Sequence, residues 1–574
     1  MREGTLTRLR THRNAFPIAA VLALAAIPLL VSDDYVIGVW TFILLNILVV
    51  VALDLLLGYA GQLSLGHGAF VAMGAYASAL LTSKAGWSGW AAIPVGMLAA
   101  ALLAALIAIP TLRLRGYYLA MATLGFPILF DALVRVGSSW TGGSSGVTAI
   151  PRLTVGEFVL RDPIAYYYLV LVFVGLALVL TWRIAGSLLG LKLRAIHADE
   201  TAAMARGINV VRLKVGVFSL SAAIAALSGS LYVHNVQFVA AGTFGLQYSL
   251  MLVVMLVAGG MGRIWGGVLG VIVLSWLPEL LRDAATWQPV IFGGLLALIM
   301  LFSPEGLAGL VRRLSSFSPS DRHLSSGDRV AAPQAVLEVR DIKKNFGGVA
   351  AVSSLHFDVK AGQIRAIIGP NGAGKSTALA LISGALTADS GSIRIAGRES
   401  VSRQAYQRAR AGLSRTFQHA RLISSLTVFE NIVLGASASG GTQGECEGRA
   451  EAVLHELGLC EVAHRFPGEI NHFERRLTEV ALALAAQPTL LLLDEPGAGL
   501  SEAEIEKLAS TLRAQRERGT AIVLVDHIMA LVMPLADRIL VLDGGVQIAD
   551  GDPASVTNDK RVRAAYLGEG AANA

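Results

Sequence analysis

Apolar positions are distributed very differently in the two halves of this 574-residue chain. Residues 15–303 contain repeated apolar runs close to the roughly 20 residues that a helix needs to cross a bilayer. Residues 336–574 show an ordinary mixture of helix and strand patterns. A segment rich in Ser, Pro and charge separates the halves. The pattern predicts a polytopic α-helical membrane domain over 1–314, a linker over 315–335 and an α/β domain over 336–574.

The apolar runs predict about ten membrane spans, of which the third and the eighth are also compatible with re-entrant segments. Basic residues concentrate in alternate loops, which places those loops, both termini and the α/β domain on the cytoplasmic side. The first run is expected to remain as a helix, because no convincing small-residue cleavage site precedes residue 32. The predicted spans are 15–31, 36–57, 64–82, 91–110, 117–136, 164–182, 214–233, 243–259, 264–281 and 289–303.

Composition favours a membrane domain joined to a soluble one. Hydrophobic residues make up 54% of the chain and charged residues 15%, against roughly 45–50% and 25% in a soluble globular protein. The net charge of +6 falls largely in short loops between apolar runs, so membrane topology explains it and nucleic acid is not expected as a partner. The two cysteines, Cys446 and Cys460, have no metal-like spacing and indicate no disulfide framework.

A glycine-rich loop, `GPNGAGKST` at residues 369–377, follows a predicted strand and opens a predicted helix. Its glycines let backbone N–H groups point at a phosphate, and the helix N-terminus adds its dipole. Lys375 supplies a charge to the β- and γ-phosphates, and Ser376 offers a hydroxyl to Mg²⁺. The loop therefore predicts binding of ATP and Mg²⁺ by Gly369, Asn371, Gly372, Gly374, Lys375, Ser376 and Thr377.

A second motif, `LLLLDEP` at residues 490–496, is a buried strand that ends in two carboxylates. Unpaired carboxylates at a buried strand end are costly, so a purely structural role explains them poorly. Asp494 is expected to hold Mg²⁺ through water, and Glu495 to orient or deprotonate the attacking water. The two motifs together predict a nucleotide hydrolase.

With these motifs in this order, the second half resembles the ATPases of ABC transporters. Its C-terminal segment, `ADGDPASVTNDKRVRAAYLG`, is similar to the extension of the branched-chain amino acid importer ATPases. The resemblance implies that Gln418 is the Q-loop residue linking Mg²⁺ and the attacking water to the permease contact. It also implies that His527 contacts the γ-phosphate and that Phe346 stacks on adenine. Ile528, where an acid is usual, and the atypical `GAGLS` that follows Pro496 depart from the family pattern.

The first half resembles the permeases of the same importer family. The resemblance rests on an ordered set of stretches: `LLLGYAGQLSLGHGAFVAMGAYASALL`, `LRLRGYYLAMATLGF`, `TGGSSGVTAIP`, `LRAIHADETAAMARGINVVRLK` and `AGGMGRIWGGVLG`. It implies a substrate path at the midplane of paired permeases. Glu200, Ala202, Ala203 and Gly207 resemble the loop by which importer permeases dock onto their ATPase, although an ordinary amphipathic interfacial helix explains the spacing equally well.

The five positions of the ABC signature are occupied here by Ile470, Asn471, His472, Phe473 and Glu474. Asn471, three residues before Glu474, predicts a capping box at a helix start. Phe473 places a ring where a glycine normally lets the backbone approach the γ-phosphate, and Glu474 adds a negative charge if its side chain turns toward the nucleotide. Because ABC ATPases pair head to tail, this loop is expected to serve the ATP of a partner. The alternative is a divergent but functional loop.

Several polar residues fall inside predicted spans, where ionisable groups are costly and usually face protein or water. Asp54 is expected to contact either substrate or a partner helix. Asp131 and Arg135, four residues apart, are expected to satisfy each other near the outer boundary. His67 and His234 are expected to be packed and hydrogen-bonded rather than metal ligands.

The combined resemblance predicts a fused permease–ATPase importer subunit in the bacterial inner membrane. Expected partners are a second permease, a second ATPase with an intact signature, an external binding protein and the lipid bilayer. A self-sufficient homodimer is the alternative assembly. The substrate is expected to be a branched-chain or related amino acid; urea, amides and aromatic acids are alternatives, as is an ATP-gated regulatory or scaffold protein without net transport.

Overall fold

The protein divides into two compact units in a computed structural model that describes residues 21–31, 33–111, 117–156, 158–282, isolated positions from 287 to 307, and 335–567. The first unit comprises Met1–Leu193 and Val211–Phe317. The second comprises Ser318–Ala574 together with the short segment Arg194–Val210, which interrupts the first unit in sequence.

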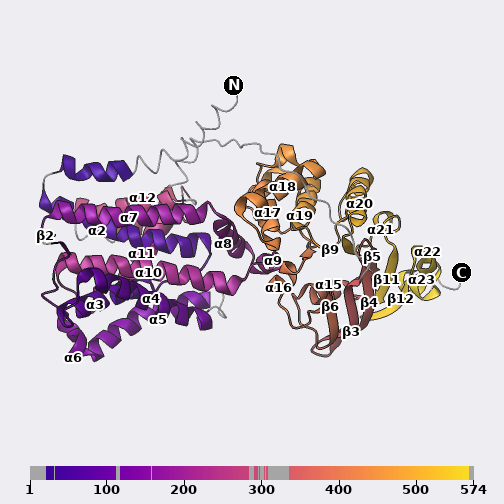
Figure 1. The fold of residues 1–574 in the computed structure, drawn as a ribbon, viewed down its shortest axis with the longest axis horizontal. Coiled ribbons are helices and arrows are strands. Elements are labelled where there is room, and N and C mark those ends of the chain that lie inside the picture. Colours follow the sequence, from indigo (N-terminus) through magenta and orange to yellow (C-terminus); the bar gives the residue numbers. More distant parts are fainter. Residues whose placement is uncertain are drawn as a thin grey trace, which may run out of the picture. The chain divides into compact units, whose positions relative to one another are not determined.

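The described part of the first unit is mainly helical (Figure 1). Short elements connect the long helices: the π-helical η1 (Leu55–Tyr59), α6 (Ser138–Thr141), η2 (Gly143–Ser145), and the two-residue strands β1 (Thr154–Val155) and β2 (Phe158–Val159). The longer helices are Val21–Leu30, α2 (Asp34–Asp54), α3 (His67–Ser83), α4 (Gly89–Thr111), α5 (Tyr117–Val136), α7 (Pro163–Ala185), α8 (Leu188–Ala198), α10 (Val210–Val236), α11 (Leu246–Gly259) and α12 (Ile264–Leu280).

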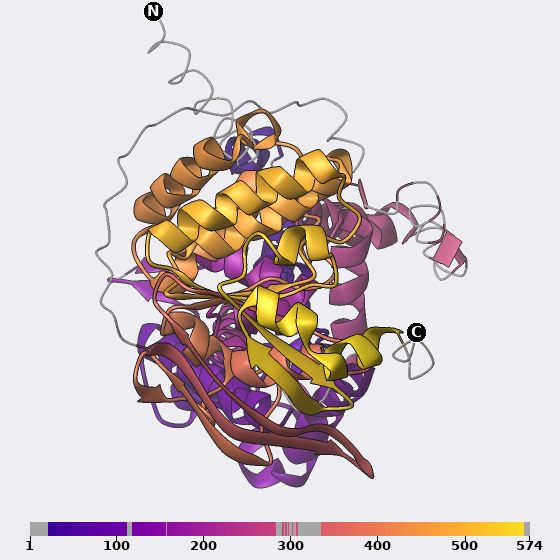
Figure 2. The ribbon, with the colours of Figure 1, turned by 90° about the vertical axis from the view of Figure 1, so that its right-hand side faces the viewer.

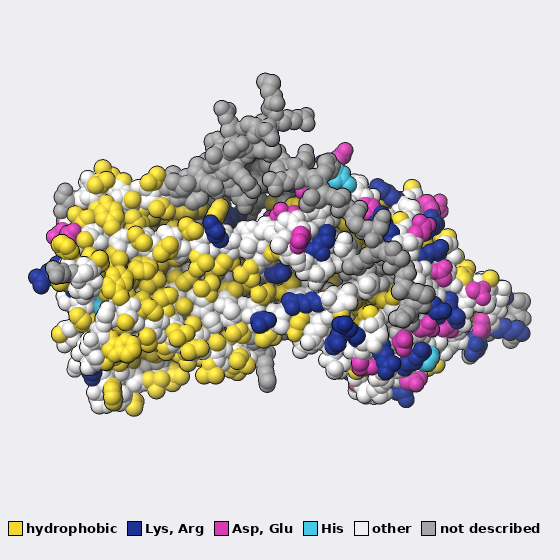
Figure 3. All heavy atoms as spheres, in the orientation of Figure 1, with side chains coloured by type: hydrophobic (Ala, Val, Ile, Leu, Met, Phe, Trp, Pro, Cys, Tyr) yellow, Lys and Arg dark blue, Asp and Glu magenta, His cyan; other side chains and the backbone are white. Residues whose placement is uncertain are grey.

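Helices occupy the second to the ninth predicted spans and part of the first, while the tenth falls largely outside the described residues. Four of the described helices are long and apolar enough to cross a membrane, or up to six if each bent pair counts as one span. One bent pair is α11 and α12, between which the chain bends by 119° across a break at residues 260–263. Hydrophobic side chains cover much of the surface of this unit in Figure 3, as expected of a membrane protein.

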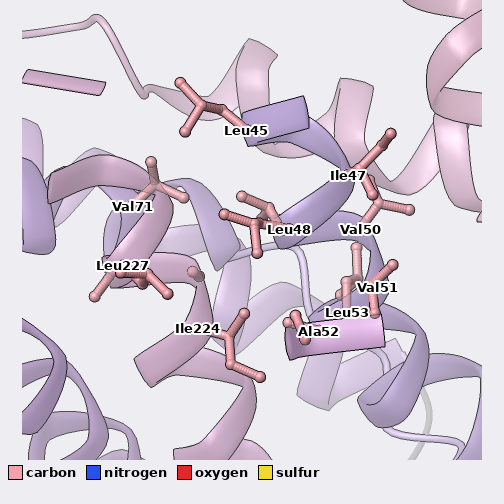
Figure 4. Close-up of a cluster of buried hydrophobic side chains, with 14 of the residues drawn as sticks. Leu45, Ile47, Leu48, Val50, Val51, Ala52, Leu53, Val71, Ile224 and Leu227 are labelled. Atoms are coloured by element: carbon pink, nitrogen blue, oxygen red, sulfur yellow. The ribbon is translucent and has the colours of Figure 1, made fainter. Parts of the chain in front are cut away.

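Helix α2 supplies much of the core of the first unit. Figure 4 shows its side chains, among them Leu48 and Leu53, beside Val71 of α3 and Ile224 of α10. Helices α3 and α10 approach closely because glycines lie at their contact. A Cβ atom added to Gly229 of α10 would lie 1.9 Å from the carbonyl oxygen of Val71, so only glycine allows this packing.

Three buried polar residues inside the predicted spans have hydrogen-bond partners within this unit. The Oδ1 atom of Asp54 accepts a hydrogen bond of 2.7 Å from the N–H of Gly262, so Asp54 ties the end of α2 to the break between α11 and α12. The ring nitrogens of His67 lie 3.0 and 2.8 Å from the hydroxyls of Ser64 and Ser221. His234 likewise contacts a serine hydroxyl and a backbone carbonyl. The expectation that both histidines are packed and hydrogen-bonded is confirmed.

The second unit is built on a ten-stranded sheet of order β7-β6-β3-β4-β12-β11-β5-β10-β9-β8, which twists beneath a layer of helices (Figure 2). Its parallel strands β5, β10 and β9 are buried throughout, as expected of strands covered on both faces. The strands are β3 (Ala335–Phe346), β4 (Val349–Lys360), β5 (Ile364–Ile368), β6 (Ser390–Ile395), β7 (Arg398–Glu399), β8 (Leu413–Arg415), β9 (Leu490–Asp494), β10 (Ala521–Val525), β11 (Arg538–Asp543) and β12 (Val546–Gly551).

Helices of the second unit follow most of these strands. They are α9 (Glu200–Ala205), α15 (Lys375–Ser383), α16 (Ala405–Arg410), α17 (Val428–Ala436), α18 (Gln443–Leu457), α19 (His472–Ala485), α20 (Glu502–Glu517), α21 (Met529–Val532), α22 (Pro553–Asn558) and α23 (Lys560–Leu567). The predicted fold class, a helical membrane domain followed by an α/β domain, is confirmed.

Candidate functional site

The residues predicted to bind and hydrolyse ATP lie together at one edge of the sheet in the second unit. Strand β10 pairs in parallel with both β5 and β9, so the carboxyl ends of the three strands lie side by side. The loop after β5 contains the glycine-rich motif, β9 ends at Asp494, and His527 follows β10. Ligands of open α/β sheets bind outside the carboxyl ends of the strands, and the sequence places its candidate residues there.

The glycine-rich loop adopts a backbone that requires glycine. Gly369 has φ 153° and Gly374 has φ 96°, and a Cβ atom at either position would lie within 2.4 Å of a carbonyl oxygen of a neighbouring strand or turn. Among the described residues, the N–H groups of Gly372, Gly374 and Lys375 have no hydrogen-bond partner. These donors stand at the start of α15 and are available to an anion.

The ammonium group of Lys375 is held across this loop. Its Nζ donates hydrogen bonds to the carbonyl oxygens of Gly369, at 2.6 Å, and Pro370, at 2.8 Å. Burial lowers the pKa of Lys375, and the carboxylates of Glu495 and Asp494 oppose that shift. The buried charge therefore stands beside the two acids of the second motif.

Asp494 is half-paired at the end of β9. Its Oδ2 accepts a hydrogen bond of 3.1 Å from Arg415, whereas its Oδ1 is buried and has no hydrogen-bond partner among the described residues. Burial raises the pKa of Asp494, and the positive charge of Arg415 lowers it. One carboxylate oxygen is thus fixed and the other remains open to a ligand.

Glu495, Gln418 and His527 form one cluster. The amide of Gln418 donates to Glu495 Oε2 at 3.0 Å, and His527 Nδ1 lies 4.0 Å from the same oxygen. Glu495 has φ 47°, unusual for a residue other than glycine, and its N–H donates to the carbonyl of Val525 at the end of β10. The backbone of the adjacent strand therefore fixes where this carboxylate points.

The predictions did not include Asp526, which organises the loops around this cluster. Its fully buried carboxylate accepts hydrogen bonds from the N–H groups of Gly497, His527 and Ile528, at 2.8 to 3.0 Å. These bonds join the turn after Glu495 to the turn after β10. An acid at the end of an apolar strand, next to His527, is the sequence signal that identifies this position.

The signature-like loop, residues 470–474, forms the predicted capping box. Asn471 Oδ1 accepts from the N–H of Glu474 at 2.8 Å, and Glu474 Oε2 accepts from the N–H of Asn471 at 2.9 Å. The charge of Glu474 therefore turns back onto its own helix start. No hydrogen bond or ion pair joins this loop to residues 369–377 within the described part of the chain.

The ring of Phe473 is half-buried against its own domain. Lys507 of α20 lies over it, with Nζ 5.5 Å from the ring centre. The adjacent His472 ring lies 3.2 Å from the carbonyl oxygen of Ala498, in the atypical segment after Glu495. Phe346, at the end of β3, is 48% exposed and lies beneath Lys344. An exposed ring remains available for stacking.

Three family models match this chain in succession. The branched-chain amino acid transport system / permease component matches residues 35–304, the ABC transporter matches 352–498, and the branched-chain amino acid ATP-binding cassette transporter matches 546–572. In the ATPase half, the ATP-binding protein LivG of Salmonella typhimurium, named for high-affinity branched-chain amino acid transport, is 35% identical over 41% of this chain and 99% of its own length.

The permease half has a counterpart of its own. The permease protein LivM of the high-affinity branched-chain amino acid transport system of Escherichia coli is 32% identical over 52% of this chain and 76% of its own length. The chain belongs to the branched-chain amino acid family of ABC transporters. It carries a permease and an ABC ATPase in one polypeptide, and ATP hydrolysis by the second half drives import.

Among solved structures, a nucleotide-free ATP-binding cassette from an ABC transporter is 26% identical to the ATPase half of this transporter. The match covers 41% of this chain and all of that chain, with a TM-score of 0.39.

The predicted docking segment of this ABC transporter forms part of the second unit. Ala202 and Ala203 are buried in α9, and Gly207, with φ 75°, accepts a hydrogen bond of 2.8 Å from Arg410 at its carbonyl oxygen. Glu200 is the first residue of α9. The predicted positions therefore define a short capped helix in contact with α16.

Three residues missed by the predictions make polar contacts in this segment. Asp199 caps α9 and accepts a hydrogen bond of 2.6 Å from Arg421, three residues after Gln418. Buried Arg206 donates to the carbonyl of Arg421 at 2.5 Å. Burial raises the pKa of Asp199, but hydrogen bonds from Ala202 and Arg421 outweigh it, so the net pKa lies below its usual value.

Proposed function

We propose that this chain is the fused permease–ATPase subunit of an importer for branched-chain amino acids. The observation that supports it best is one polypeptide that covers 76% of a branched-chain amino acid permease and 99% of the corresponding ATP-binding protein. The permease half forms the route through the membrane, and ATP hydrolysis by the ATPase half drives transport along it. We place it in the bacterial inner membrane, with both termini and the ATPase in the cytoplasm.

The phosphate groups of ATP are held by the loop at the start of α15. The open N–H groups of Gly372 and Gly374 face the β-phosphate, while Gly369, Asn371 and Thr377 complete the cradle. The ammonium of Lys375 donates hydrogen bonds to two carbonyl oxygens. When ATP binds, this ammonium turns toward the β- and γ-phosphates. The exposed ring of Phe346 stacks on adenine.

The residues near the phosphates also fit Mg²⁺. Asp494 offers a buried oxygen that has no hydrogen-bond partner among the described residues, and Ser376 and Gln418 offer a hydroxyl and an amide oxygen. Oxygen ligands of this kind, completed by phosphate and water, are those that Mg²⁺ prefers. Bound there, the ion neutralises charge that develops on the phosphates.

Hydrolysis is assigned to the cluster around Glu495. Its carboxylate, fixed by Gln418 and by the backbone of β10, orients the attacking water and accepts its proton. His527 contacts the γ-phosphate from the loop that Asp526 organises. Gln418, which contacts Glu495, lies three residues before Arg421, which contacts Asp199 at the start of α9. One short segment therefore connects the docking helix to the carboxylate proposed to be the base.

The assembly is proposed to be asymmetric. We infer a second permease, a second ATPase with an intact signature, and an external binding protein that delivers substrate. ATP bound at Lys375 of this chain meets the partner's signature, whereas ATP bound by the partner meets Phe473, Asn471 and Glu474. The first site hydrolyses ATP at full rate and the second slowly, because Phe473 places a Cβ atom and a ring where a close backbone approach is needed.

Uptake tests the proposed function directly. The assembled importer is supplied with labelled leucine, isoleucine, valine, urea, a short amide and an aromatic amino acid, with the Lys375→Ala variant as control. We expect ATP-dependent uptake of the branched-chain amino acids and uptake at background in the variant. Selective uptake of urea or amides, or uptake that survives Lys375→Ala, would contradict the proposal.

A further inference from the structure

Two arginine side chains lie over the ring of Phe417, the residue directly before Gln418. The guanidinium carbon of Arg415 is 5.2 Å from the ring centre, and that of Arg421 is 4.6 Å from it. Such contacts are attractive because the positive charge meets the electron-rich face of the ring. Phe417 therefore connects two cationic groups that would otherwise repel each other.

Each of these arginines also binds an acid, and the two acids lie in different parts of the domain. Nη1 of Arg421 donates to Asp199 Oδ2 at 2.6 Å, at the start of α9. Nη2 of Arg415 donates to Asp494 Oδ2 at 3.1 Å, at the end of β9. Five side chains in contact therefore run from α9 to the acid proposed to bind Mg²⁺. This Asp199–Asp494 series consists of Asp199, Arg421, Phe417, Arg415 and Asp494.

The Asp494 end of the series is buried and is also tied to the helix after the glycine-rich loop. The side chains of Arg415 and Asp494 are only 8% and 5% exposed, so water screens their ion pair little. Nη1 of Arg415 donates to the hydroxyl of Ser383 at 2.9 Å, and Ser383 is the last residue of α15. One guanidinium therefore fixes Asp494 Oδ2 relative to α15, and Oδ1 is the oxygen left for Mg²⁺.

The backbone of Phe417 is held by contacts that do not involve its ring. Its N–H donates to Glu479 Oε1 at 2.9 Å, and its carbonyl oxygen accepts from Arg476 Nη1 at 3.2 Å. Both of these residues lie on α19. The adjacent Gln418 directs its amide at Glu495 instead. A substitution that changes only the ring is therefore expected to leave the backbone and the Gln418 contact in place.

We propose that Phe417 is a positioning residue that transmits the position of α9 to Asp494 by a route that does not pass through Gln418. A shift of α9 moves Arg421, the ring carries that shift to Arg415, and Arg415 sets the position of the Asp494 carboxylate. Packed side chains and ion pairs in contact are one physical means of coupling distant sites. The inference rests on the proposed function, because it takes Asp494 as a ligand of Mg²⁺ and α9 as the docking segment.

Binding of Mn²⁺ in place of Mg²⁺ tests this inference without a measurement of activity, because both ions prefer oxygen ligands. Electron paramagnetic resonance measures Mn²⁺ binding to the assembled importer in the presence of a non-hydrolysable ATP analogue. The second ATPase carries alanine for the lysine of its phosphate loop, so the bound ion reports the site of this chain. We expect Phe417→Leu to weaken Mn²⁺ binding about threefold to fivefold, because both arginines lose their ring contact.

Two control variants separate the ring contacts from packing in general. Phe417→Tyr keeps the ring and should bind Mn²⁺ as the wild type does. Phe429→Leu is the matched control, because Phe429 of α17 is also half-buried and no guanidinium lies over its ring within the described residues. An equal loss of Mn²⁺ binding in Phe417→Leu and Phe429→Leu, or in Phe417→Leu and Phe417→Tyr, would contradict the inference.

A double-mutant cycle shows whether the coupling reaches α9. Asp199→Asn is expected to weaken Mn²⁺ binding about twofold in the otherwise wild-type chain, because Arg421 loses its ion pair. In the Phe417→Leu background the same substitution should change nothing further, because the series is already interrupted. An equal effect of Asp199→Asn in both backgrounds, or no effect in either, would contradict the inference.

The Asp494→Asn variant separates this inference from the proposed function. If Asp494→Asn weakens Mn²⁺ binding but Phe417→Leu does not, the role of Phe417 is contradicted while Asp494 remains a ligand of the metal. If Asp494→Asn leaves Mn²⁺ binding unchanged, the assignment of Asp494 to Mg²⁺ and the role of Phe417 are both contradicted. Uptake of the labelled amino acids tests the proposed transport independently of either result.

Discussion

Two loops of the ATPase half precede helices that are proposed to contact ATP, one before α15 and one before α19. They differ in how many of their backbone N–H groups are free of hydrogen bonds. The loop before α15 uses glycines at positive φ, and its N–H groups at Gly372 and Gly374 have no partner among the described residues. The loop before α19 closes a capping box between Asn471 and Glu474, which consumes two N–H groups. The first helix start is open to an anion, and the second is partly satisfied by its own side chains.

This difference separates the two half-sites that one ABC ATPase contributes. In the proposed assignment, the half-site that holds this chain's own ATP contains the glycine-rich loop, Lys375, Asp494 with one unpaired oxygen, and the cluster around Glu495. The half-site proposed to serve a partner's ATP contains Phe473, whose ring lies beneath Lys507. We propose that phosphate binding at these helix starts requires free N–H groups and a close approach of the backbone, which the first loop offers and the second does not.

The largest effect is expected at the retained half-site. Glu495→Gln keeps the size of the side chain and an acceptor for Gln418, but removes the base. We expect the ATPase rate of the assembled complex to fall about 100-fold or more, with ATP binding retained. Glu506→Gln on the surface of α20 is the control. A rate within threefold of wild type would exclude Glu495 as the base.

A smaller effect is expected where α9 contacts the segment after Gln418. Asp199→Asn and Arg421→Ala each break the hydrogen bond of 2.6 Å between these side chains. We expect stimulation of the ATPase by substrate to fall several-fold while the basal rate stays within twofold, because an exposed ion pair contributes little to stability itself. Arg518→Ala, which breaks a pair with Glu456, is the control. Equal stimulation in all variants would rule out this route.

The contact between Asp199 and Arg421 has a defined pH dependence. The pKa of Asp199 is lowered in the folded protein, so the stabilisation from its charge is present above the ordinary carboxyl pKa, about 3.9, and is lost only as pH falls through the lower folded value. We expect the ratio of stimulated to basal ATPase to change little between pH 6 and 8 on account of this group. A drop in this ratio between pH 6 and 8 that Asp199→Asn abolishes would contradict this expectation, because it would show that the carboxyl of Asp199 titrates in that range.

The smallest effect is expected from the cap of α19. Asn471→Ala removes the acceptor for the N–H of Glu474, and a lost cap costs about 1 kcal/mol. Thr442→Ala at the start of α18 removes an acceptor of the same kind, for the N–H of Glu445, and is the control. Thermal unfolding of the full chain should shift by a similar small amount in both, but only Asn471→Ala should also change the ATPase rate. Identical ATPase rates would mean that the cap is purely structural.

The sequence predicted those parts of the site that lie close together along the chain. The glycine-rich loop, the acids that end β9 and the capping box each depend on residues within one turn or strand end. It did not predict where the ring of Phe473 points, because that depends on Lys507 of α20. Asp526 was missed because its hydrogen bond from the N–H of Gly497 joins the loops after two separate strands, β9 and β10.

In the membrane half, the positions of the helices followed from apolar run length, because the bilayer fixes it. The hydrogen-bond partners of the polar residues could not be predicted from the sequence. Asp54 contacts the N–H of Gly262 from 208 residues away, and the spacing of Asp131 and Arg135 predicted their ion pair but not the atoms it leaves open. Such contacts depend on how distant helices pack, which periodicity alone does not encode.

Replacement of Phe473 by glycine tests the claimed difference between the two half-sites most directly. The measurement is the steady-state ATPase rate of the assembled complex at saturating ATP, with Phe473→Gly compared with wild type and with Phe473→Tyr as a control that keeps the ring. We predict that Phe473→Gly raises the rate severalfold, as the lent half-site gains the backbone approach that the γ-phosphate requires, and that Phe473→Tyr does not. An unchanged rate in Phe473→Gly would contradict the account.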